Sequence, residues 1–385
     1  MDGPNGDSNK IGVKTSNFIC PNCGGTLKFN IKSQVFECSA CKTRTDLEAV
    51  VDSVKEYDFS EYKKREAGSV PFEGMAVAHC STCGAEITFS GTQFSGVCPM
   101  CGSTQIAEEK QRSGIPPEGV VTFKIDKDDA GQKFRSWVRS RWFAPNNFKK
   151  SYAEGGLTAM YLPFWTYDTK VVARYYGQGG VNRTVRGDDG KPRVVTDWYS
   201  VSGVVYNDFD DIQVSATDKS EHLQGILPFN TVNNTKPFSM GYLSGYYAEV
   251  YKIKADAAFE QAKLIIRGHM DGLAHNEILM RYDQARVSSL DIKHSDIMYK
   301  HLLLPVYVSS FRFNGKTFSY AINGETGRIS GKRPYSAPKI IAAAIALIIV
   351  VLMLSTFLEE DSYGYIDNYD IVSIKYDNNI EWSEV

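Results

Sequence analysis

The chain lacks several features that would reveal its class quickly. Its first ten residues are polar and contain no apolar run, so they do not resemble a secretory signal peptide. Eight cysteines in 385 residues are too few for a disulfide-dense secreted scaffold. Neither sign of charge dominates, because 43 Lys and Arg face 45 Asp and Glu and give a net charge of −2. A nucleic-acid binder that is basic throughout is therefore excluded, although a local basic patch is not.

Catalytic motifs are also missing. The sequence contains no HExxH and no GxSxG motif. Gly315, Lys316 and Thr317 imitate the end of a P-loop, but Ser310 stands where that motif needs its first glycine. The six histidines form no set with the spacing of metal ligands. We therefore expect a protein that is not an enzyme and has no small-molecule substrate.

One long uncharged run is present near the C-terminus, at residues 340–358. A helix of this length spans roughly 28 Å, close to the ~30 Å hydrocarbon core of a bilayer. A buried core helix seldom lacks a polar face over five turns, so we expect a single transmembrane helix at 338–358. Basic residues precede the run and acidic residues follow it. The positive-inside rule then predicts a cytoplasmic N-terminal region, with the acidic tail at 359–385 on the opposite side.

All eight cysteines fall into CxxC pairs that form an internal repeat. Fourteen residues separate the two pairs of each half, and the second half is the first displaced by sixty residues. Two CxxC turns on adjacent hairpins can complete a tetrahedral sulfur site with no open position, so we predict two structural Zn²⁺ ions. Iron has the same four-thiolate geometry and is the less favoured alternative. The ligands of the first site are Cys20, Cys23, Cys38 and Cys41, and those of the second are Cys80, Cys83, Cys98 and Cys101.

The residue after the second cysteine of each pair is informative. It is a glycine in three pairs, at Gly24, Gly84 and Gly102, where a tight turn needs a positive φ. Lys42 occupies this position in the fourth pair.

The patterns divide the chain into segments of different character. The predicted fold is two small four-cysteine zinc ribbons, followed by an α+β domain dominated by antiparallel sheet and then the membrane helix. Leu47, Val50, Val51 and Val54 recur at helical spacing and predict a helical connector between the ribbons. The expected boundaries are 1–17 for a disordered N-terminus, 18–45 and 78–108 for the ribbons, 46–77 for the connector and 109–335 for the α+β domain.

Helices of the α+β domain are predicted from caps and apolar stripes. Asp126 is expected to cap a helix that runs to about Phe143 and is stopped by Pro145. A second helix is expected at 255–281, where apolar residues form one stripe.

The strands of this domain are predicted from alternation. Residues 157–250 and 301–330 alternate like strands, and Asn314-Gly315 between apolar segments predicts a hairpin. The similar segments at 161–165 and 303–307 suggest a duplicated β-unit. The aromatic residues are expected to fill the core. Asp208, Asp210 and Asp211 form an acidic cluster that could hold a cation, although loop carboxylates are usually only solvated.

Residues 133–150 contain six basic residues, no acidic residue and interleaved aromatic residues, among them Trp137, Trp142, Phe143 and Phe148. Cations with aromatics suit phosphate neutralisation and base stacking, and they also suit an anionic membrane surface. The plainer interpretation is a helix with its aromatic face in the core and its basic face in water. The candidate nucleic-acid contacts are Lys133, Arg135, Arg139, Arg141, Lys149 and Lys150.

The order of the segments resembles a known family. Ribbons with Cys-Pro-x-Cys turns are followed by FKIDKDDA, RWFAPNNFKK, YLPFWTYD, SGYYAEVY, LLLPVY and NGETGRISGKRPYSAPKI. Over residues 18–340 the chain is similar to a bacterial and phage-borne family of membrane-anchored double zinc-ribbon proteins, often labelled primosomal-helicase-like or transcription-factor-type zinc ribbon proteins. The resemblance implies zinc ribbons but no activity, and the helicase part of the label lacks its nucleotide-binding motif here.

Two hypotheses about function follow. The first is a non-enzymatic, membrane-tethered zinc-ribbon protein that acts as a binding scaffold for a macromolecular partner, in the first place another protein. The alternative is a protein that tethers DNA or RNA to the membrane through the ribbons and the basic stretch at 133–150.

Overall fold

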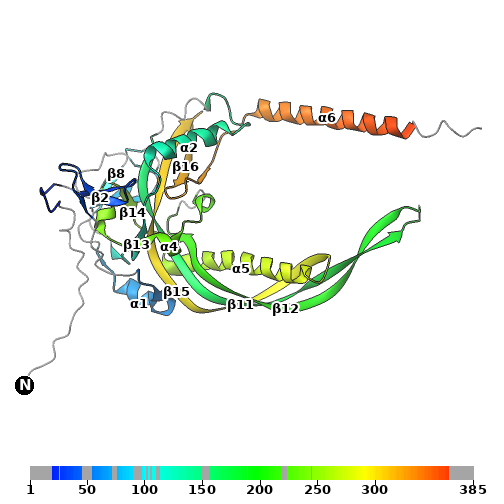
Figure 1. Ribbon diagram of the computed structural model, residues 1–385, viewed down its shortest axis with the longest axis horizontal. Helices are drawn as coiled ribbons and strands as arrows, with labels where there is room; N and C mark the ends of the chain where they lie inside the picture. The colour runs from blue at the N-terminus through cyan, green and yellow to red at the C-terminus, as the bar shows by residue number, and fades with distance from the viewer. Residues whose placement is uncertain are drawn as a thin grey trace, which may run out of the picture.

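Alternating apolar and polar residues build very long strands from residue 158 onwards, as the computed structural model shows (Figure 1). The predicted N-terminal segment at 1–17 and the tail beyond residue 363 lie outside the residues that the structure describes. The described residues are 20–25, 27–45, 54–71, 76–89, 98–100, 103–104, 106–109, 113–148, 156–188, 190–218, 223–243 and 245–363.

Three long strands dominate the fold. β11 (Thr158–Arg186) lies between β12 (Pro192–Ser215) and β15 (Gln284–Phe313), and both pairs are antiparallel. The β11–β12 hairpin and the first part of β15 project from the body as an arm (Figure 1). α5 (Ala255–Leu279) covers one face of this arm (Figure 1). The helix predicted at 255–281 is confirmed, and its apolar stripe is buried against the arm through Ile266, Met270, Ala274 and Ile278.

Shorter strands extend this core into a sheet of twelve strands among the described residues. Two of its pairs are parallel, β10 with β15 and β11 with β14, and its other pairs are antiparallel, so antiparallel pairing dominates as predicted. Residues 223–243, predicted as strand, instead consist mainly of helical turns. The further elements of the body are β10 (Gly119–Val121), β13 (Thr235–Pro237), β14 (Tyr247–Glu249), β16 (Lys316–Asn323), β17 (Ile329–Gly331), η5 (Gln224–Ile226), α4 (Thr231–Asn234) and η6 (Met240–Leu243).

Two local predictions from the sequence concern β15. Asn314 and Gly315, with φ of 49° and 75°, turn β15 into β16, so the predicted hairpin is confirmed. Of the similar segments at 161–165 and 303–307, the first three residues of each are paired with each other in antiparallel register, with Pro163 opposite Leu303. The two similar segments therefore lie near one end of the β11–β15 ladder.

Aromatic side chains fill the body, as predicted. Tyr161, Trp165, Tyr167, Tyr299 and Tyr307 are each at most 1% exposed. Among them, the Trp165 indole N–H donates to the Ile253 carbonyl at 2.8 Å, and the Tyr307 hydroxyl donates to the Ile125 carbonyl at 2.8 Å. Paired polar ends lower the cost of burying Trp165 and Tyr307.

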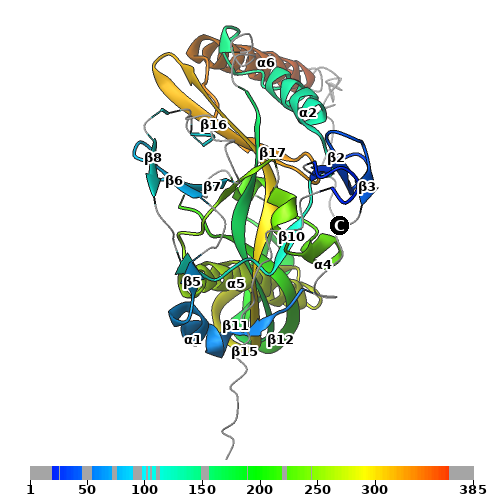
Figure 2. The same ribbon diagram turned by 90° about the vertical axis from the view of Figure 1, so that its left-hand side faces the viewer.

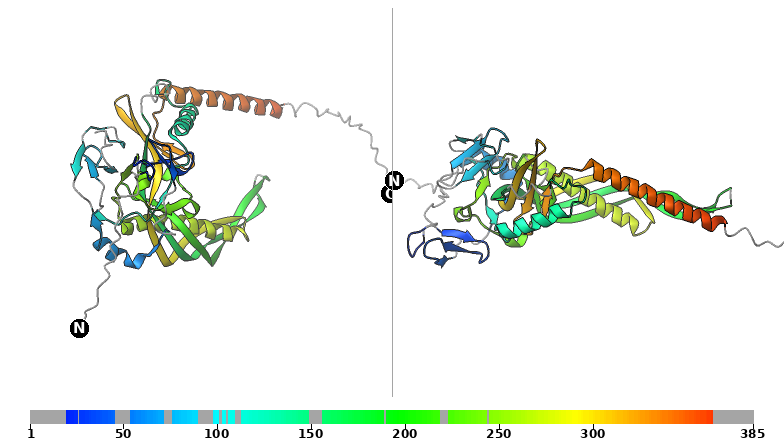
Figure 3. Two further views of the ribbon diagram at one scale, coloured as in Figure 1. Left: turned by 60° about the vertical axis from the view of Figure 1, so that its left-hand side comes forward. Right: turned by 90° about the horizontal axis from the view of Figure 1, so that it is seen from above.

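The cysteine-containing segments attach to the body in two different ways. The first cysteine module (residues 20–45) forms its own sheet from β1 (Leu27–Asn30), β2 (Val35–Cys38) and β3 (Arg44–Thr45). The second cysteine module (residues 76–109) contributes β6 (Ala76–Cys80), β7 (Glu86–Phe89) and β8 (Ile106–Glu109) to the main sheet, because β7 pairs with β14. The two modules lie on opposite flanks of the body (Figure 2 and Figure 3, right).

The segment between the modules differs from the predicted helical connector at 46–77. Leu47, Val50 and Val51 lie outside the described residues. From residue 54 onwards the chain forms β4 (Tyr57–Asp58), η2 (Phe59–Glu61), the six-residue α1 (Tyr62–Ala67) and β5 (Val70–Pro71), which pairs with β9 (Ser113–Gly114). β4 pairs with β15, and Tyr62 is buried against Tyr299. The described part of the connector therefore docks on the sheet, and of its residues only 59–67 form helical turns.

α2 (Lys127–Arg139) begins as predicted and ends early. The Asp126 side chain accepts the N–H of Asp129 at 2.8 Å, which confirms the cap. The helix ends at Arg139 rather than near Phe143, because the chain turns there and buries Ala144 in the core. The residues between α2 and Pro145 thus form a loop.

α6 (Ala337–Tyr363) leaves the body as a bare helix (Figure 1). Its segment Ala337–Ser355 has a mean hydropathy of 2.7, and none of it is buried against the described part of the chain. It is long and apolar enough to cross a membrane. It overlaps nearly all of the membrane helix predicted at 338–358.

Candidate metal centres and basic surface

The first cysteine module brings four thiols to one point. The sulfurs of Cys20 and Cys41 are 3.5 Å apart, as are those of Cys23 and Cys38, and all four lie within 4.8 Å of one another. A disulfide would need about 2.0 Å. Cys20 and Cys38 are buried and Cys23 and Cys41 face solvent, so the cluster lies at the edge of the module.

Tight turns hold the thiols in place. The N–H of Gly24 donates to the Cys20 carbonyl at 2.9 Å, and the N–H of Gly84 donates to the Cys80 carbonyl at 2.6 Å. Both glycines have a positive φ, 72° and 70°, as the sequence predicts. Lys42 makes the same turn to Cys38 with a φ of 61°, a conformation that costs energy for a residue with a side chain.

The protonation of the four thiols is uneven. The hydroxyl of Thr43, followed by its backbone N–H, lowers the pKa of Cys41 to about 5. At Cys23 the backbone N–H of Gly25 acts to lower the pKa, but the thiols of Cys41 and Cys38 outweigh it and raise the pKa to about 12. Adjacent thiolates repel each other, and a divalent cation at their centre would remove that repulsion. Four convergent sulfurs therefore fit a soft tetrahedral metal ion.

The second module repeats the arrangement for the ligands that are described. The sulfurs of Cys80, Cys83 and Cys98 lie within 4.8 Å of one another, and those of Cys83 and Cys98 are 3.6 Å apart. Cys80 is 0% exposed and Cys98 1%. The fourth predicted ligand, Cys101, lies outside the described residues. Both clusters could hold metal ions, which agrees with the prediction of two metal sites.

The basic stretch at 133–150 lies partly on α2 and partly on the loop after it. Phe134 and Phe148 are buried in the core, as the plainer interpretation expects. Two other aromatic residues are not, since Trp142 is 83% exposed and Phe143 41%. Of the six predicted nucleic-acid contacts, Lys133, Arg135 and Arg139 are exposed, Arg141 is half-buried, and Lys149 and Lys150 lie outside the described residues.

A buried carboxylate cluster was not predicted as such. Oxygens of Glu56, Asp168 and Asp211 lie within 4.8 Å of one another, and the Lys300 Nζ is 2.5 Å from Glu56 Oε1 and 2.7 Å from Asp211 Oδ1. Burial, opposed by the Asp211 N–H and reinforced by Glu56, raises the pKa of Asp168 to about 7. The cluster assembles where β11 changes register against both of its neighbours.

Asp211 alone of the predicted acidic cluster enters this site. Asp208 and Asp210 are exposed on β12, as the solvated interpretation expects. The internal cation Lys300 already pairs with two of the three carboxylates. The arrangement therefore serves to hold the segment around Glu56 on the sheet.

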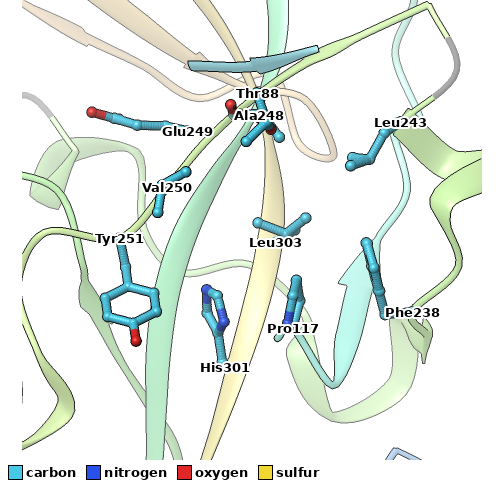
Figure 4. A pocket seen from close by; sticks show the side chains of 10 residues that line it. All are labelled: Thr88, Pro117, Phe238, Leu243, Ala248, Glu249, Val250, Tyr251, His301 and Leu303. Carbon is cyan, nitrogen blue, oxygen red and sulfur yellow. Dashed lines mark hydrogen bonds between the residues drawn. The ribbon is translucent and has the colours of Figure 1, made fainter. Parts of the chain in front are cut away.

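A hollow of about 330 Å³ lies between the second module and β15 (Figure 4). Its lining is largely apolar, with His301 and Glu249 among the polar groups. Burial lowers the pKa of His301 to about 4, so the ring is neutral at pH 7 and its Nδ1 lies 3.0 Å from the Ile115 carbonyl. The lining residues are Thr88, Pro117, Phe238, Leu243, Ala248, Glu249, Val250, Tyr251, His301 and Leu303.

Comparison with known proteins gives one distant relative. The chain is 26% identical over 327 residues to the uncharacterized protein YdjG of Bacillus subtilis (strain 168). The aligned region covers 84% of this chain and 92% of that protein. No family model matches the chain, and no solved structure is significantly similar to it.

Proposed function

We propose that this protein is a membrane-tethered zinc-ribbon protein, without enzymatic activity, that binds a protein partner on the cytoplasmic side. The observation that carries the proposal is the combination of two cysteine clusters and a bare apolar helix on one body with a projecting arm. The tether would keep the arm and the two modules near the membrane. A partner recruited there would be held at high local concentration.

Zinc is the proposed metal, because four-cysteine sites built from two CxxC turns are typical of structural zinc, and four thiolates leave no coordination position for a substrate. In that role the eight cysteines would hold two ions, and each ion would supply folding free energy to a module with a small core. Elemental analysis of the purified full chain should find about two zinc atoms per chain. The Cys20→Ser, Cys80→Ser double variant should lose most of them, and iron in the wild type would contradict the assignment.

The proposed orientation rests on charge. Lys332, Arg333 and Lys339 precede the apolar run, and Glu359, Glu360 and Asp361 follow it. A reporter enzyme that is active only outside the cytoplasm should show activity when it is fused after Val385. Activity of a cytoplasm-only reporter at the same position would refute the orientation.

The face of the arm opposite α5 is the proposed partner surface. Val172 and Tyr206 are directly opposite each other on β11 and β12 and are 39% and 69% exposed. Tyr176 and Val204 are exposed on the same two strands. Exposed apolar and aromatic side chains that gather on one face are typical of interaction sites.

Site-specific photocrosslinking tests this assignment. A photoreactive residue at Tyr206 of the full chain in its native cell should give a discrete protein adduct, which a second substitution, Val172→Glu, should abolish. The matched control is Leu264, which is 70% exposed on the outer side of α5. Adducts at Leu264 alone, or none at Tyr206, would contradict the proposed surface.

Nucleic-acid tethering is the second candidate, favoured by the exposure of Lys133, Arg135 and Arg139 on α2. Binding through several phosphates should weaken by roughly 10³-fold or more between 50 and 200 mM salt. Titration of the full chain in detergent with labelled DNA and RNA checks this. The Arg135→Ala, Arg139→Ala double variant should then lose the affinity. Unchanged affinity in the variant would remove α2 from that role.

A further inference from the structure

The loop that follows α2 is fixed to the first turn of α6. The Lys339 ammonium donates to the carbonyls of Trp142 and Ala144 at 3.3 and 2.8 Å and to Asn146 Oδ1 at 2.8 Å. The N–H of Ser336 donates to the Phe143 carbonyl at 2.8 Å. Residues 141–146, called the α2 loop from here on, therefore lie at the point where the apolar helix begins.

The α2 loop exposes aromatic side chains at that point. Trp142 is 83% exposed and Phe143 41%, and Tyr335 on the link to α6 is 61% exposed. Ala144 and Phe148, by contrast, face inwards and are buried in the core. Tryptophan and tyrosine are enriched at membrane interfaces, where the ring meets apolar chains and its polar atom meets water.

Two guanidinium groups beside these rings have no anionic partner among the described residues. The Nε atoms of Arg141 and Arg333 make no hydrogen bond to the described part of the chain. Burial and, next, the charge of Arg333 lower the pKa of Arg141. Each guanidinium instead lies over an aromatic ring, Arg141 at 4.6 Å from the centre of Trp137 and Arg333 at 5.3 Å from that of Tyr335. Two cations that repel each other at an exposed aromatic surface are suited to a bound phosphate.

We propose that the α2 loop, with Arg333 and Tyr335, binds the anionic phospholipid headgroups of the bilayer that α6 enters. This inference rests on the membrane tether of the proposed function. It assigns part of the basic stretch to lipid, because the loop is bonded to the membrane helix itself. Phosphate groups would meet the guanidinium groups, and the Trp142 and Phe143 rings would lie at the boundary with the acyl chains.

The arm restricts how the bilayer can approach. α6 and the arm leave the body in roughly the same direction (Figure 1). The end of the arm carries Arg183, Lys191 and Arg193, all exposed, and such charges do not enter hydrocarbon. The bilayer can therefore hold α6 only if the helix tilts away from the arm. The end of the body that carries α2 is then the part that meets the headgroups.

Fluorescence of the full chain in vesicles tests the inference. The vesicles contain phosphatidylcholine, with or without phosphatidylglycerol, and lipids brominated near the headgroup. Subtracting the emission spectrum of the Trp142→Phe variant from that of the wild type gives the emission of Trp142 alone. We expect the brominated lipids to quench this emission and the bilayer to protect it from aqueous iodide. The matched control is Trp198→Phe, on the arm, whose difference emission should show the reverse.

Charge variants test the headgroup contact. Arg141→Gln combined with Arg333→Gln should abolish the extra quenching that phosphatidylglycerol gives, whereas Arg135→Gln, at an exposed position on α2, should leave it unchanged. Equal quenching of the double variant and the wild type would overturn the role of the guanidinium groups. Protection of Trp142 by single-stranded DNA but not by anionic vesicles would overturn the lipid assignment in favour of nucleic acid.

Flotation separates this inference from the tether. A chain that floats with vesicles after alkaline washing, but whose Trp142 is open to iodide, would overturn the docking of the α2 loop and leave the tether intact. A chain that does not float would refute the tether, and the lipid contact would fall with it.

Discussion

The two cysteine modules share one spacing of cysteines but are built into the molecule differently. The second module is joined by backbone hydrogen bonds, with Thr88 opposite Ala248 and the Val250 N–H donating to the Glu86 carbonyl at 3.0 Å. The first module is held by side chains, since Phe29 and Phe36 pack around Tyr242 at ring distances of 5.5 and 5.2 Å. The same cysteine pattern can therefore be an integral part of a sheet or an attached unit, and the spacing of the cysteines does not say which.

The largest expected effect comes from replacing one cysteine in each module and comparing the two variants. Cys98→Ser should lower the free energy of unfolding of the whole body by on the order of 5 kcal/mol, because β7 continues through β14 into β11. Cys38→Ser, at the equivalent position of the first module, should unfold only that module. Hydrogen exchange checks this through the amides of β14 and β11. Equal exchange there in the two variants would contradict the difference in attachment.

A smaller effect is expected at the contact that holds the first module. Phe36 is 2% exposed, so Phe36→Ala should cost about 3–4 kcal/mol of docking free energy. The first module should become sensitive to protease, while the melting temperature of the remaining body stays unchanged. Tyr242→Ala should reproduce the result from the other side. A fall in the melting temperature of the whole chain would show that the first module is not a separate unit.

The segment that joins the modules gives a pH-dependent effect. Asp168, which faces Glu56 of this segment, has a pKa of about 7 in the folded chain and an ordinary value of 3.8. Between those values the unfolded chain has released the proton and the folded chain keeps it, so this group lowers stability as pH rises from about 4 to 7. Asp168→Asn should flatten that part of the stability profile, measured by urea unfolding at pH 5 and 8. An unchanged slope would contradict the assignment.

The smallest effect is expected within the first module. Lys42 has a φ of 61° where Gly24 and Gly84 have 72° and 70°. Lys42→Gly should therefore stabilise the metal-loaded first module by about 0.5–1 kcal/mol. Gly24→Ala should destabilise it by a similar amount. Zinc competition with a chelator measures both, and a loss of affinity in Lys42→Gly would show that the lysine side chain itself is needed.

Local features of this fold were predictable because their causes are local. The Asp126 cap, the Asn314-Gly315 turn, the glycine turns after the cysteines and the stripe of α5 each depend on a few neighbouring residues. The convergence of Cys20, Cys23, Cys38 and Cys41 was predictable because spacing alone brings CxxC pairs together.

Features that depend on distant parts of the chain were not predictable. The helical spacing at residues 47–54 did not reveal that the following residues would pair with β15. The cluster of Glu56, Asp168, Asp211 and Lys300 joins four separate segments through changes of register in β11. The contact of Lys339 with the α2 loop also spans almost two hundred residues of sequence, and only the folded chain brings these groups together.

The length of β15 has a mechanical consequence. The strand runs without interruption from Gln284 on the arm to Phe313, turns into β16, and β16 pairs with β17 (Ile329–Gly331), which lies just before α6. A pulling force on the arm would therefore act parallel to β15 and shear it against its neighbouring strands. Many backbone hydrogen bonds would then resist the force at the same time. A partner that moves the arm would exert its force on the apolar helix α6 through a stiff strut rather than through a flexible linker.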